Sequence, residues 1–267
     1  MWARRGLRVR VPPHAPWGTP LDATIYRLMA ETQQNHWWFG ARRRILAAVL
    51  RRLPLPKPAR VLEIGCGTGG NLQMLARFGR VDAAEMDEYA IAIARAQGSG
   101  ADVRRGWLPD AMPFEPAGQY DVICLFDVLE HIEDDESALR ALRALLAPGG
   151  RVLLTVPAYQ WLFGAHDRAH HHYRRYTTRR LRRIARAAGF EVCRSGYFNT
   201  LLFPVLAARR LLARAGRGEP EDDARMPSPL LNGVLAAVFG AERLVLPLFA
   251  FPYGSSAIAV LRRPEHG

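Results

Sequence analysis

The stretch that decides the fold is Val61-Leu62-Glu63-Ile64-Gly65-Cys66-Gly67-Thr68-Gly69-Gly70. Its first four residues form a short apolar run with one acid, as expected of a buried parallel strand. Glycines follow at positions 65, 67, 69 and 70, and residues 71–78 then place apolar side chains at helical spacing. The stretch therefore predicts a strand, a tight glycine turn and a helix. Such a turn lets a ligand approach the backbone closely, and a helix start favours an anionic group.

The spacing of these glycines is Gly-x-Gly-x-Gly after an acid, and it lacks the Lys-Ser/Thr pair of a phosphate-binding P-loop. The pattern resembles the first motif of class I S-adenosylmethionine-dependent methyltransferases. The segment His36-Trp37-Trp38-Phe39, followed by arginines at 42–44, resembles the N-terminal segment of a bacterial subgroup of these enzymes. Taken by themselves, these aromatic residues either cover an edge of the sheet, form a lid over the cofactor or line the substrate.

Three downstream signals follow in the order that this resemblance implies. Glu85 ends a second predicted strand about 20 residues beyond the glycines, where an acid accepts hydrogen bonds from ribose hydroxyls. Residues 120–126 form an apolar strand that ends in the polar sequence Asp127-Val128-Leu129-Glu130-His131. Pro148-Gly149-Gly150 precedes a further strand and is typical of the family.

The resemblance implies an α/β fold of the Rossmann-like class I methyltransferase type. Its seven-stranded sheet has the order 3-2-1-4-5-7-6, with the last strand antiparallel and helices on both faces. We expect residues 1–20 to be a disordered basic arm and residues 21–267 to form the methyltransferase domain. Within it, residues 199–252 are expected to be an apolar helical insertion between strands six and seven.

S-adenosylmethionine is the cofactor that the resemblance implies. Glu63 and the glycines would hold its methionine end, Glu85 the ribose, and the segment beginning at Trp107 the adenine. Many relatives carry an acid where Trp107 stands, so adenine recognition here would use ring contacts and backbone groups. The expected cofactor-binding residues are Glu63, Gly65, Cys66, Gly67, Gly69, Glu85, Met86, Trp107, Leu108 and Phe126.

The methyl acceptor is expected beside residues 157–176, because a connection that leaves the carboxyl end of a parallel strand begins on the ligand face. This loop contains four histidines, an aspartate and several aromatic residues. A histidine can act as general base for an oxygen or nitrogen nucleophile, and two neighbouring arginines can bind a phosphate bidentately. The candidates are His131, His166 and His170 for catalysis, and Tyr159, Trp161, Arg174 and Arg175 for substrate binding.

The gap between His166 and His170 suits a metal pair, but no cysteine accompanies them, and we expect no metal. An alternative comes from Asp127, Glu130 and His131. These resemble the acid-x-x-Glu-His arrangement of ubiquinone-type O-methyltransferases, where it binds magnesium.

The chain has 267 residues, and 37 basic against 25 acidic residues give it a net charge of +12. Lys57 is its only lysine, so the excess reflects either a high-GC genome or an anionic partner such as a phosphorylated substrate, nucleic acid or anionic membrane. The cysteines at 66, 124 and 193 show no paired or metal-type spacing, which suits a reducing compartment. The arginine-rich N-terminus is not a secretory signal.

The insertion contains no apolar run of the roughly 18–20 residues that a spanning helix needs. Two amphipathic helices that lie on a bilayer or form an apolar lid fit it better, with a dimer interface as the alternative. We therefore expect a cytoplasmic methyltransferase, peripheral on the inner face of the cell membrane, that acts on oxygen or nitrogen of a lipid-linked, isoprenoid or glycolipid acceptor. The alternatives are a soluble small-molecule or nucleic-acid acceptor, although the apolar insertion argues against nucleic acid, and a non-catalytic scaffold at a membrane. The oligomeric state stays open.

Overall fold

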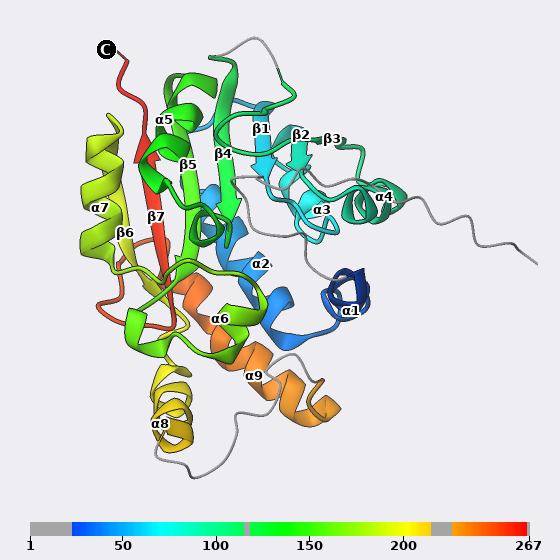
Figure 1. Ribbon diagram of the computed structural model, residues 1–267, viewed down its shortest axis with the longest axis vertical. Helices are drawn as coiled ribbons and strands as arrows, with labels where there is room; N and C mark the ends of the chain where they lie inside the picture. The colour runs from blue at the N-terminus through cyan, green and yellow to red at the C-terminus, as the bar shows by residue number, and fades with distance from the viewer. Residues whose placement is uncertain (1–22, 115–117, 215–225, 266–267) are drawn as a thin grey trace, which may run out of the picture.

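A computed structural model of the chain describes residues 23–114, 118–214 and 226–265 (Figure 1). The basic arm predicted for residues 1–20 lies outside the described residues.

Seven strands form one sheet in the order β3-β2-β1-β4-β5-β7-β6, which confirms the predicted topology. All neighbouring strands pair in parallel except β7, which is antiparallel to both β5 and β6. The carboxyl ends of the five strands β1 to β5 therefore meet at one end of the molecule, the lower end in Figure 1. The strands are β1 (Ala59–Ile64), β2 (Gly79–Glu85), β3 (Asp102–Arg105), β4 (Tyr120–Phe126), β5 (Leu146–Pro157), β6 (Glu191–Phe198) and β7 (Ser256–Arg262).

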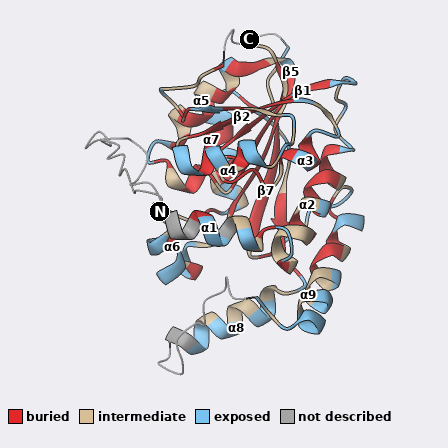
Figure 2. Ribbon diagram, turned by 90° about the vertical axis from the view of Figure 1, so that its right-hand side faces the viewer, coloured by how far each residue is buried: buried red, intermediate tan, exposed pale blue. Residues whose placement is uncertain are grey.

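Helices cover both faces of this sheet because its strands are apolar on both sides (Figure 2). In β1, Leu62 and Ile64 face the core formed with α5 (Asp135–Leu145) and α7 (Thr178–Ala187). Val61 faces the opposite core. That second core is formed with α2 (Trp37–Leu50), α3 (Leu72–Leu75) and α4 (Glu88–Ala96).

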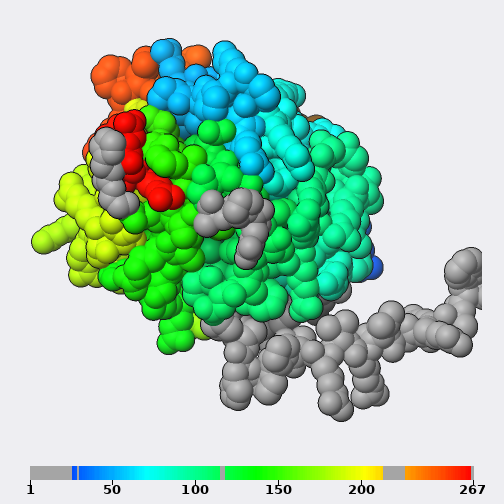
Figure 3. Space-filling model, turned by 90° about the horizontal axis from the view of Figure 1, so that it is seen from above, coloured from blue at the N-terminus to red at the C-terminus, as the bar shows by residue number. Residues whose placement is uncertain are grey.

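Two local expectations differ from the structure. The helix predicted over 71–78 is only the four residues of α3, because the chain enters β2 at Gly79. Pro148-Gly149-Gly150 lies inside β5, in an irregularity where the register with β4 shifts. There the Gly149 amide donates to the Arg263 carbonyl at 3.1 Å, and Figure 3 shows the C-terminal residues, in red, lying against this green part of the chain.

The insertion between β6 and β7 consists of α8 (Phe203–Arg214), α9 (Pro229–Ala241) and the short η3 (Glu242–Leu244). Both long helices lie beyond the carboxyl ends of the strands (Figure 1). No helix within the described part of the chain has the length and hydrophobicity to cross a membrane. The Glu242 carboxylate accepts hydrogen bonds from the backbone amides of Asn199, Thr200 and Leu201, at 2.6 to 3.0 Å, and so ties the two ends of the insertion together.

The aromatic residues at the start of α2 anchor this insertion. Trp38 stacks on Phe239 of α9 with ring centroids 4.9 Å apart, and Trp37 meets the same ring edge-on. The Asn232 side chain accepts from the Trp37 amide at 2.8 Å. The His-Trp-Trp-Phe segment therefore packs α2 against α9.

Candidate functional site

The glycine turn after β1 has the backbone that a ligand cradle requires. Gly65 and Gly67 have φ angles of +68° and +54°, which favour glycine. A Cβ atom on Gly65 would come within 2.5 Å of Val128 Cγ2, whereas a Cβ on Gly67 would meet no atom within 4 Å. The turn is therefore closed against β4 at Gly65 and open at Gly67.

Glu63 is buried at the end of β1 and is only half satisfied. Its Oε1 accepts from Asn71 Nδ2 at 2.8 Å, while Oε2 has no hydrogen-bond partner within the described part of the chain. Burial raises the pKa of this carboxyl from 4.5 to about 8, although the Asn71 hydrogen bond and Arg42 act in the opposite direction. A cationic group placed at Oε2 would be strongly favoured.

Glu85 closes the opposite side of the turn. Its Oε2 accepts from the Gly67 amide at 2.8 Å, and its Oε1 accepts from the amides of Met86 and Asp87 at 2.8 and 3.1 Å. Burial raises the pKa of Glu85, and these backbone hydrogen bonds partly offset that effect. A carboxylate has about four lone-pair sites, so Oε2, which accepts one hydrogen bond here, can accept another from a ligand hydroxyl.

The N-terminal helix α1 (Ala23–Thr32) lies over this site. Burial raises the pKa of Tyr26, and the negative charges of Glu85 and Asp87 raise it further. The Tyr26 phenol therefore lies near Glu85. Just beyond α1, Gln33 Oε1 accepts from the Thr68 hydroxyl of the glycine turn at 3.0 Å. Gln33, just after α1, thus contacts the turn, whereas the aromatic residues Trp37 and Trp38, for which a lid was one alternative, pack against α9.

The remaining residues expected at the cofactor have varied surroundings. Trp107 is half-buried, with the Arg105 guanidinium 5.6 Å from its ring centroid, and Leu108 is fully buried in the core. Cys66 is buried beside Glu63 and Glu85, and burial raises the pKa of its thiol. Phe126, at the end of β4, carries the Arg42 guanidinium 5.6 Å from its ring centroid.

Arg42 is a buried arginine that forms an ion pair with the partly exposed Asp127, and the sequence pattern did not single out this pair. Its Nη2 lies 2.7 Å from Asp127 Oδ2 and donates to the Thr155 hydroxyl at 2.7 Å. The Thr155 hydroxyl in turn donates to Asp127 Oδ1 at 3.1 Å. Asp127 has a φ of +59°, an unusual backbone for a residue other than glycine. The ends of β4 and β5 are therefore fixed to α2 at the point where the acceptor is expected.

Histidines from two segments meet just beyond β4. His131 belongs to η1 (Leu129–His131), and its ring centroid lies 4.6 Å from that of His172. Residues 157–176, called the acceptor loop below, contain η2 (Gln160–Leu162) and α6 (Ala165–Ala169). In this loop, His166 and His170 have ring centroids 4.2 Å apart. Burial and the neighbouring histidines lower the pKa of His131 to about 3 and that of His170 to about 4, which favours neutral imidazoles.

Asp167 organises the loop, and neither it nor His172 was among the predicted catalytic residues. Its fully buried carboxylate accepts two hydrogen bonds from Arg175, at 2.7 and 2.9 Å, and lies 2.9 Å from His172 Nδ1. Although burial acts to raise the pKa of Asp167, the hydrogen bonds of His172 and Arg175 hold it below its usual value. The carboxylate therefore fixes the His172 ring with Nε2 as its free nitrogen.

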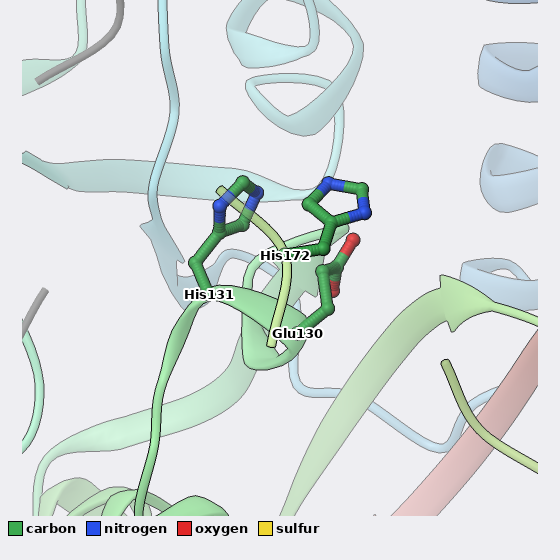
Figure 4. Close-up of side chains that lie close together, drawn as sticks. All are labelled: Glu130, His131 and His172. Carbon is green, nitrogen blue, oxygen red and sulfur yellow. The ribbon is translucent and has the colours of Figure 1, made fainter. Parts of the chain in front are cut away.

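Glu130 is a buried acid beside these histidines, and the positive charges of Arg42 and Arg175 only partly offset the effect of burial on its pKa. Its side chain is 0% exposed, and neither carboxyl oxygen has a hydrogen-bond partner among the described residues. Burial, followed by the negative charge of Asp127, raises its pKa. Figure 4 shows this carboxyl group pointing toward the ring of His172, with His131 alongside. One ligand-type atom from each of the three residues lies within 4.8 Å of the others, so this group could hold a metal ion.

The four residues expected to bind the acceptor divide into two pairs. Tyr159 and Trp161 belong to an aromatic cluster with Tyr197, Phe203 and Tyr253, whose neighbouring ring centroids lie 5.0 to 6.2 Å apart. Phe203 begins α8, so the cluster joins the acceptor loop to the insertion.

The two arginines, by contrast, are already paired. Arg175 is held by Asp167, and Arg174 Nη1 lies 3.2 Å from Asp135 Oδ2. Their guanidinium groups thus fix the loop, which argues against the expected phosphate clamp.

S-adenosylmethionine, the cofactor implied by the sequence, fits the residues around the glycine turn. The unpaired Oε2 of Glu63 suits an ammonium group, and the open space at Gly67 admits a ligand against the backbone. Glu85 has acceptor capacity for ribose hydroxyls. The carboxylates on the two sides of the turn thus match the ammonium and hydroxyl groups of the cofactor.

Comparison with known proteins identifies a matching family and similar enzymes. Residues 37–195 match a family described as a methyltransferase domain. Ubiquinone biosynthesis O-methyltransferase of Bordetella avium is 38% identical over 100 residues, 36% of this chain and 42% of that protein. The enzyme of the same name from Pseudomonas aeruginosa is 37% identical over 101 residues, 36% of this chain and 43% of that protein. The chain thus spans about two fifths of the length of these curated relatives.

Solved structures share the fold. Phosphoethanolamine N-methyltransferase 2 of Haemonchus contortus, in complex with S-adenosyl-L-methionine, superposes with a TM-score of 0.54 at 19% identity, covering 82% of this chain and 52% of that one. The methyltransferase in a complex with the Haloferax volcanii Trm112 activator superposes with a TM-score of 0.60 at 19% identity, covering 91% and 96%.

Proposed function

Because the chain belongs to the methyltransferase-domain family, we propose that it methylates an oxygen or nitrogen atom of a lipid-linked acceptor at a membrane surface. The prediction of a class I S-adenosylmethionine-dependent methyltransferase is confirmed at the level of family and fold. The names of the relatives point to an oxygen acceptor and to ubiquinone biosynthesis. The acceptor class is our proposal.

The observation that carries this proposal is the apolar surface beside the histidines. Val205 of α8 is 64% exposed, Leu230 of α9 is 80% exposed and Phe249 is 68% exposed. The insertion thus exposes several large apolar side chains, and clusters of such side chains on a surface are typical of interaction sites. Exposed arginines at 209 and 243 flank it, and these would favour an anionic bilayer.

The aromatic cluster supports the same acceptor class. It connects the exposed apolar surface to the histidine loop through the contact between Phe203 and Tyr159, whose ring centroids are 5.6 Å apart. An acceptor with an apolar tail and a polar head could lie along these rings, with its head near His172.

In the proposed reaction, S-adenosylmethionine supplies an electrophilic methyl group on a sulfonium. Glu63, the glycine turn and Glu85 hold the cofactor, and the aromatic cluster orients the acceptor. His172 accepts the proton of the acceptor hydroxyl or amine at Nε2, because Asp167 holds the other ring nitrogen. Positioning the two reactants supplies most of the acceleration.

Methyl transfer from labelled S-adenosylmethionine to a bacterial lipid extract tests the acceptor class. We expect label in the organic phase, with a strong loss in His172→Ala and in Asp167→Asn. His171→Ala is the matched control, since the His171 side chain is exposed in the same loop and should keep its activity. Label confined to the aqueous phase would exclude a lipid acceptor, and an active His172→Ala would exclude this base.

A metal at Glu130, His131 and His172 is the alternative catalytic arrangement, and it is supported by the proximity of their ligand atoms. Dialysis against a chelator separates the two. Loss of activity that a divalent cation restores would favour the metal, whereas unchanged activity would favour His172 as a base.

Membrane contact has its own test. Vesicles with anionic lipid should carry the protein upward in a flotation gradient, and replacing Leu230 and Phe249 with serine should release it. Leu28→Ser/Tyr89→Ser, at exposed apolar residues away from the insertion, serves as the matched control. Retention of the wild-type protein at the bottom of the gradient would remove the membrane proposal while leaving methyl transfer open.

A further inference from the structure

A second polar cavity lies outside the site described above. It has a volume of about 280 Å³ and lies between α2, α3 and the end of α4. Four arginines line it, together with the side-chain amides of Gln73 and Gln97. The four are Arg43, Arg44, Arg51 and Arg77, called the arginine pocket below. No acidic side chain of the described residues lines the cavity.

The sequence of α2 brings the arginines together. Arg44 lies in α2, and Arg51, seven residues later at the C-cap of that helix, lies on the same face. Arg77 follows α3 on the other side of the cavity. Arginine stays charged at all physiological pH values, so the pocket concentrates four positive charges. Arg43 is half-buried and Arg44, Arg51 and Arg77 are exposed, and a bound anion would supply a counter-charge to all four.

The described part of the chain supplies no such counter-charge. Arg43 donates to the Gln33 carbonyl at 2.7 Å and Arg44 to the Ala236 carbonyl at 3.0 Å, so each uses few of its five N–H donors on neutral acceptors. None of the four is paired with a carboxylate among the described residues. Burial, followed by the neighbouring charges of Arg42 and Arg44, lowers the pKa of Arg43. All these features favour an anion.

We propose that the arginine pocket binds a small phosphate-bearing anion. Guanidinium groups match the oxygens of a phosphate with paired N–H donors. A cavity of about 280 Å³ lies near the small end of ligand pockets, which favours a compact group such as a pyrophosphate or a phosphorylated headgroup. This ligand is separate from both the cofactor and the methyl acceptor.

The pocket is connected to the glycine turn by two hydrogen-bonded routes. Gln97, which lines it, donates from Nε2 to the Thr68 carbonyl. Arg43 holds the backbone of Gln33, whose side chain accepts from the Thr68 hydroxyl. An anion that orders these side chains would also order the cofactor turn, and the two ligands would then raise each other's affinity by the same factor.

Titration of the full-length protein with pyrophosphate in a calorimeter, without cofactor, tests the site. We expect saturable binding of one pyrophosphate per chain. Arg51→Gln/Arg77→Gln should weaken it about tenfold or more, because each substitution removes charge-assisted hydrogen bonds. Arg182→Gln/Arg183→Gln, at exposed arginines of α7, has the same change in charge and should bind like the wild type.

The result that would overturn the site is an absence of saturable heat in the folded wild-type protein, or an equal weakening in both double variants. Circular dichroism of each variant serves as the control for folding. Competition with vesicles carrying phosphatidic acid then separates the two sources of phosphate. Displacement of pyrophosphate identifies a lipid headgroup, and no displacement identifies a free anion, with the site supported in either case. Since these measurements involve no methyl transfer, they stand apart from the proposed function.

Discussion

Replacing Glu63 with glutamine tests the electrostatics of the cofactor site most directly. The glutamine keeps the shape of the side chain and its contact with Asn71, but it carries no charge at any pH. In the wild-type protein without cofactor, burial raises the pKa of Glu63 from 4.5 to about 8. The folded protein therefore binds this proton up to a higher pH than the unfolded chain does.

The sign and size of the effect follow from proton linkage. Between pH 4.5 and about 8 the folded state binds more protons than the unfolded state at this group, so the free energy of unfolding falls as the pH rises. A pKa difference of about 3.5 corresponds to roughly 5 kcal/mol at 1.4 kcal/mol for each pKa unit, which is an upper bound reached above about pH 8. Glu63→Gln should lack this loss.

Urea denaturation at pH 6, 7, 8 and about 9 measures the difference between the two proteins. We expect the wild type to lose stability relative to Glu63→Gln across this range by about 2–3 kcal/mol, the part of the linkage that falls within it. If the free energies of unfolding of the two proteins changed with pH in parallel, the argument that Glu63 is buried without a counter-charge would be refuted. Saturating S-adenosylmethionine should reduce the pH dependence of the wild type only, since an ammonium group at Oε2 favours the ionised carboxylate.

Three further changes test how the site is built. Gly65→Ala should lower the free energy of unfolding by about 2–4 kcal/mol in urea denaturation, because the new Cβ meets Val128 Cγ2 at 2.5 Å in a backbone with φ of +68°. Gly98→Ala, with φ of +64° and no atom within 4 Å of the new Cβ, should lower it by only about 1 kcal/mol. Equal losses in the two variants would contradict the close approach at Gly65. Trp38→Ala removes the ring stacked on Phe239 and should cost about 3–5 kcal/mol, whereas the exposed Trp161→Ala should cost less than about 1 kcal/mol. Glu242→Gln weakens three backbone hydrogen bonds and should speed hydrogen exchange over 199–212 while leaving β4 unchanged; unchanged exchange in the insertion would show that Glu242 does not hold it.

The arrangement of these residues shows why some of the site was predictable. Glu63, the glycines and Glu85 follow strand ends within one βαβ unit, and the register of β1 with β2 fixes their separation once the strands exist. Period-two and helical patterns locate those strands and helices from local sequence alone. The sheet order, which the structure confirms, came instead from the resemblance to the methyltransferase family, and the insertion was predicted from the long segment between the last two expected strands.

The choice among the histidines could not be made in this way. His172 is one of three consecutive histidines, and what separates it from His170 is the contact between its Nδ1 and Asp167. That contact depends on how residues 164–175 fold around a buried carboxylate. The pattern also offered Arg175 as a phosphate ligand, although the bidentate pair with Asp167 occupies it.

The sequence by itself determined the glycine turn and, through the resemblance that its motifs carry, the fold class, because those motifs consist of residues close together in the chain. Only the tertiary structure decided which histidine is oriented, that Arg42 reaches Asp127 across 85 residues, and that arginines of α2 and Arg77 line one pocket. Such pairs form when separate helices and strands pack, and their free energy comes from burial and charge between distant segments. No local periodicity records those contacts, whereas the glycine turn carries its own backbone requirement in its sequence.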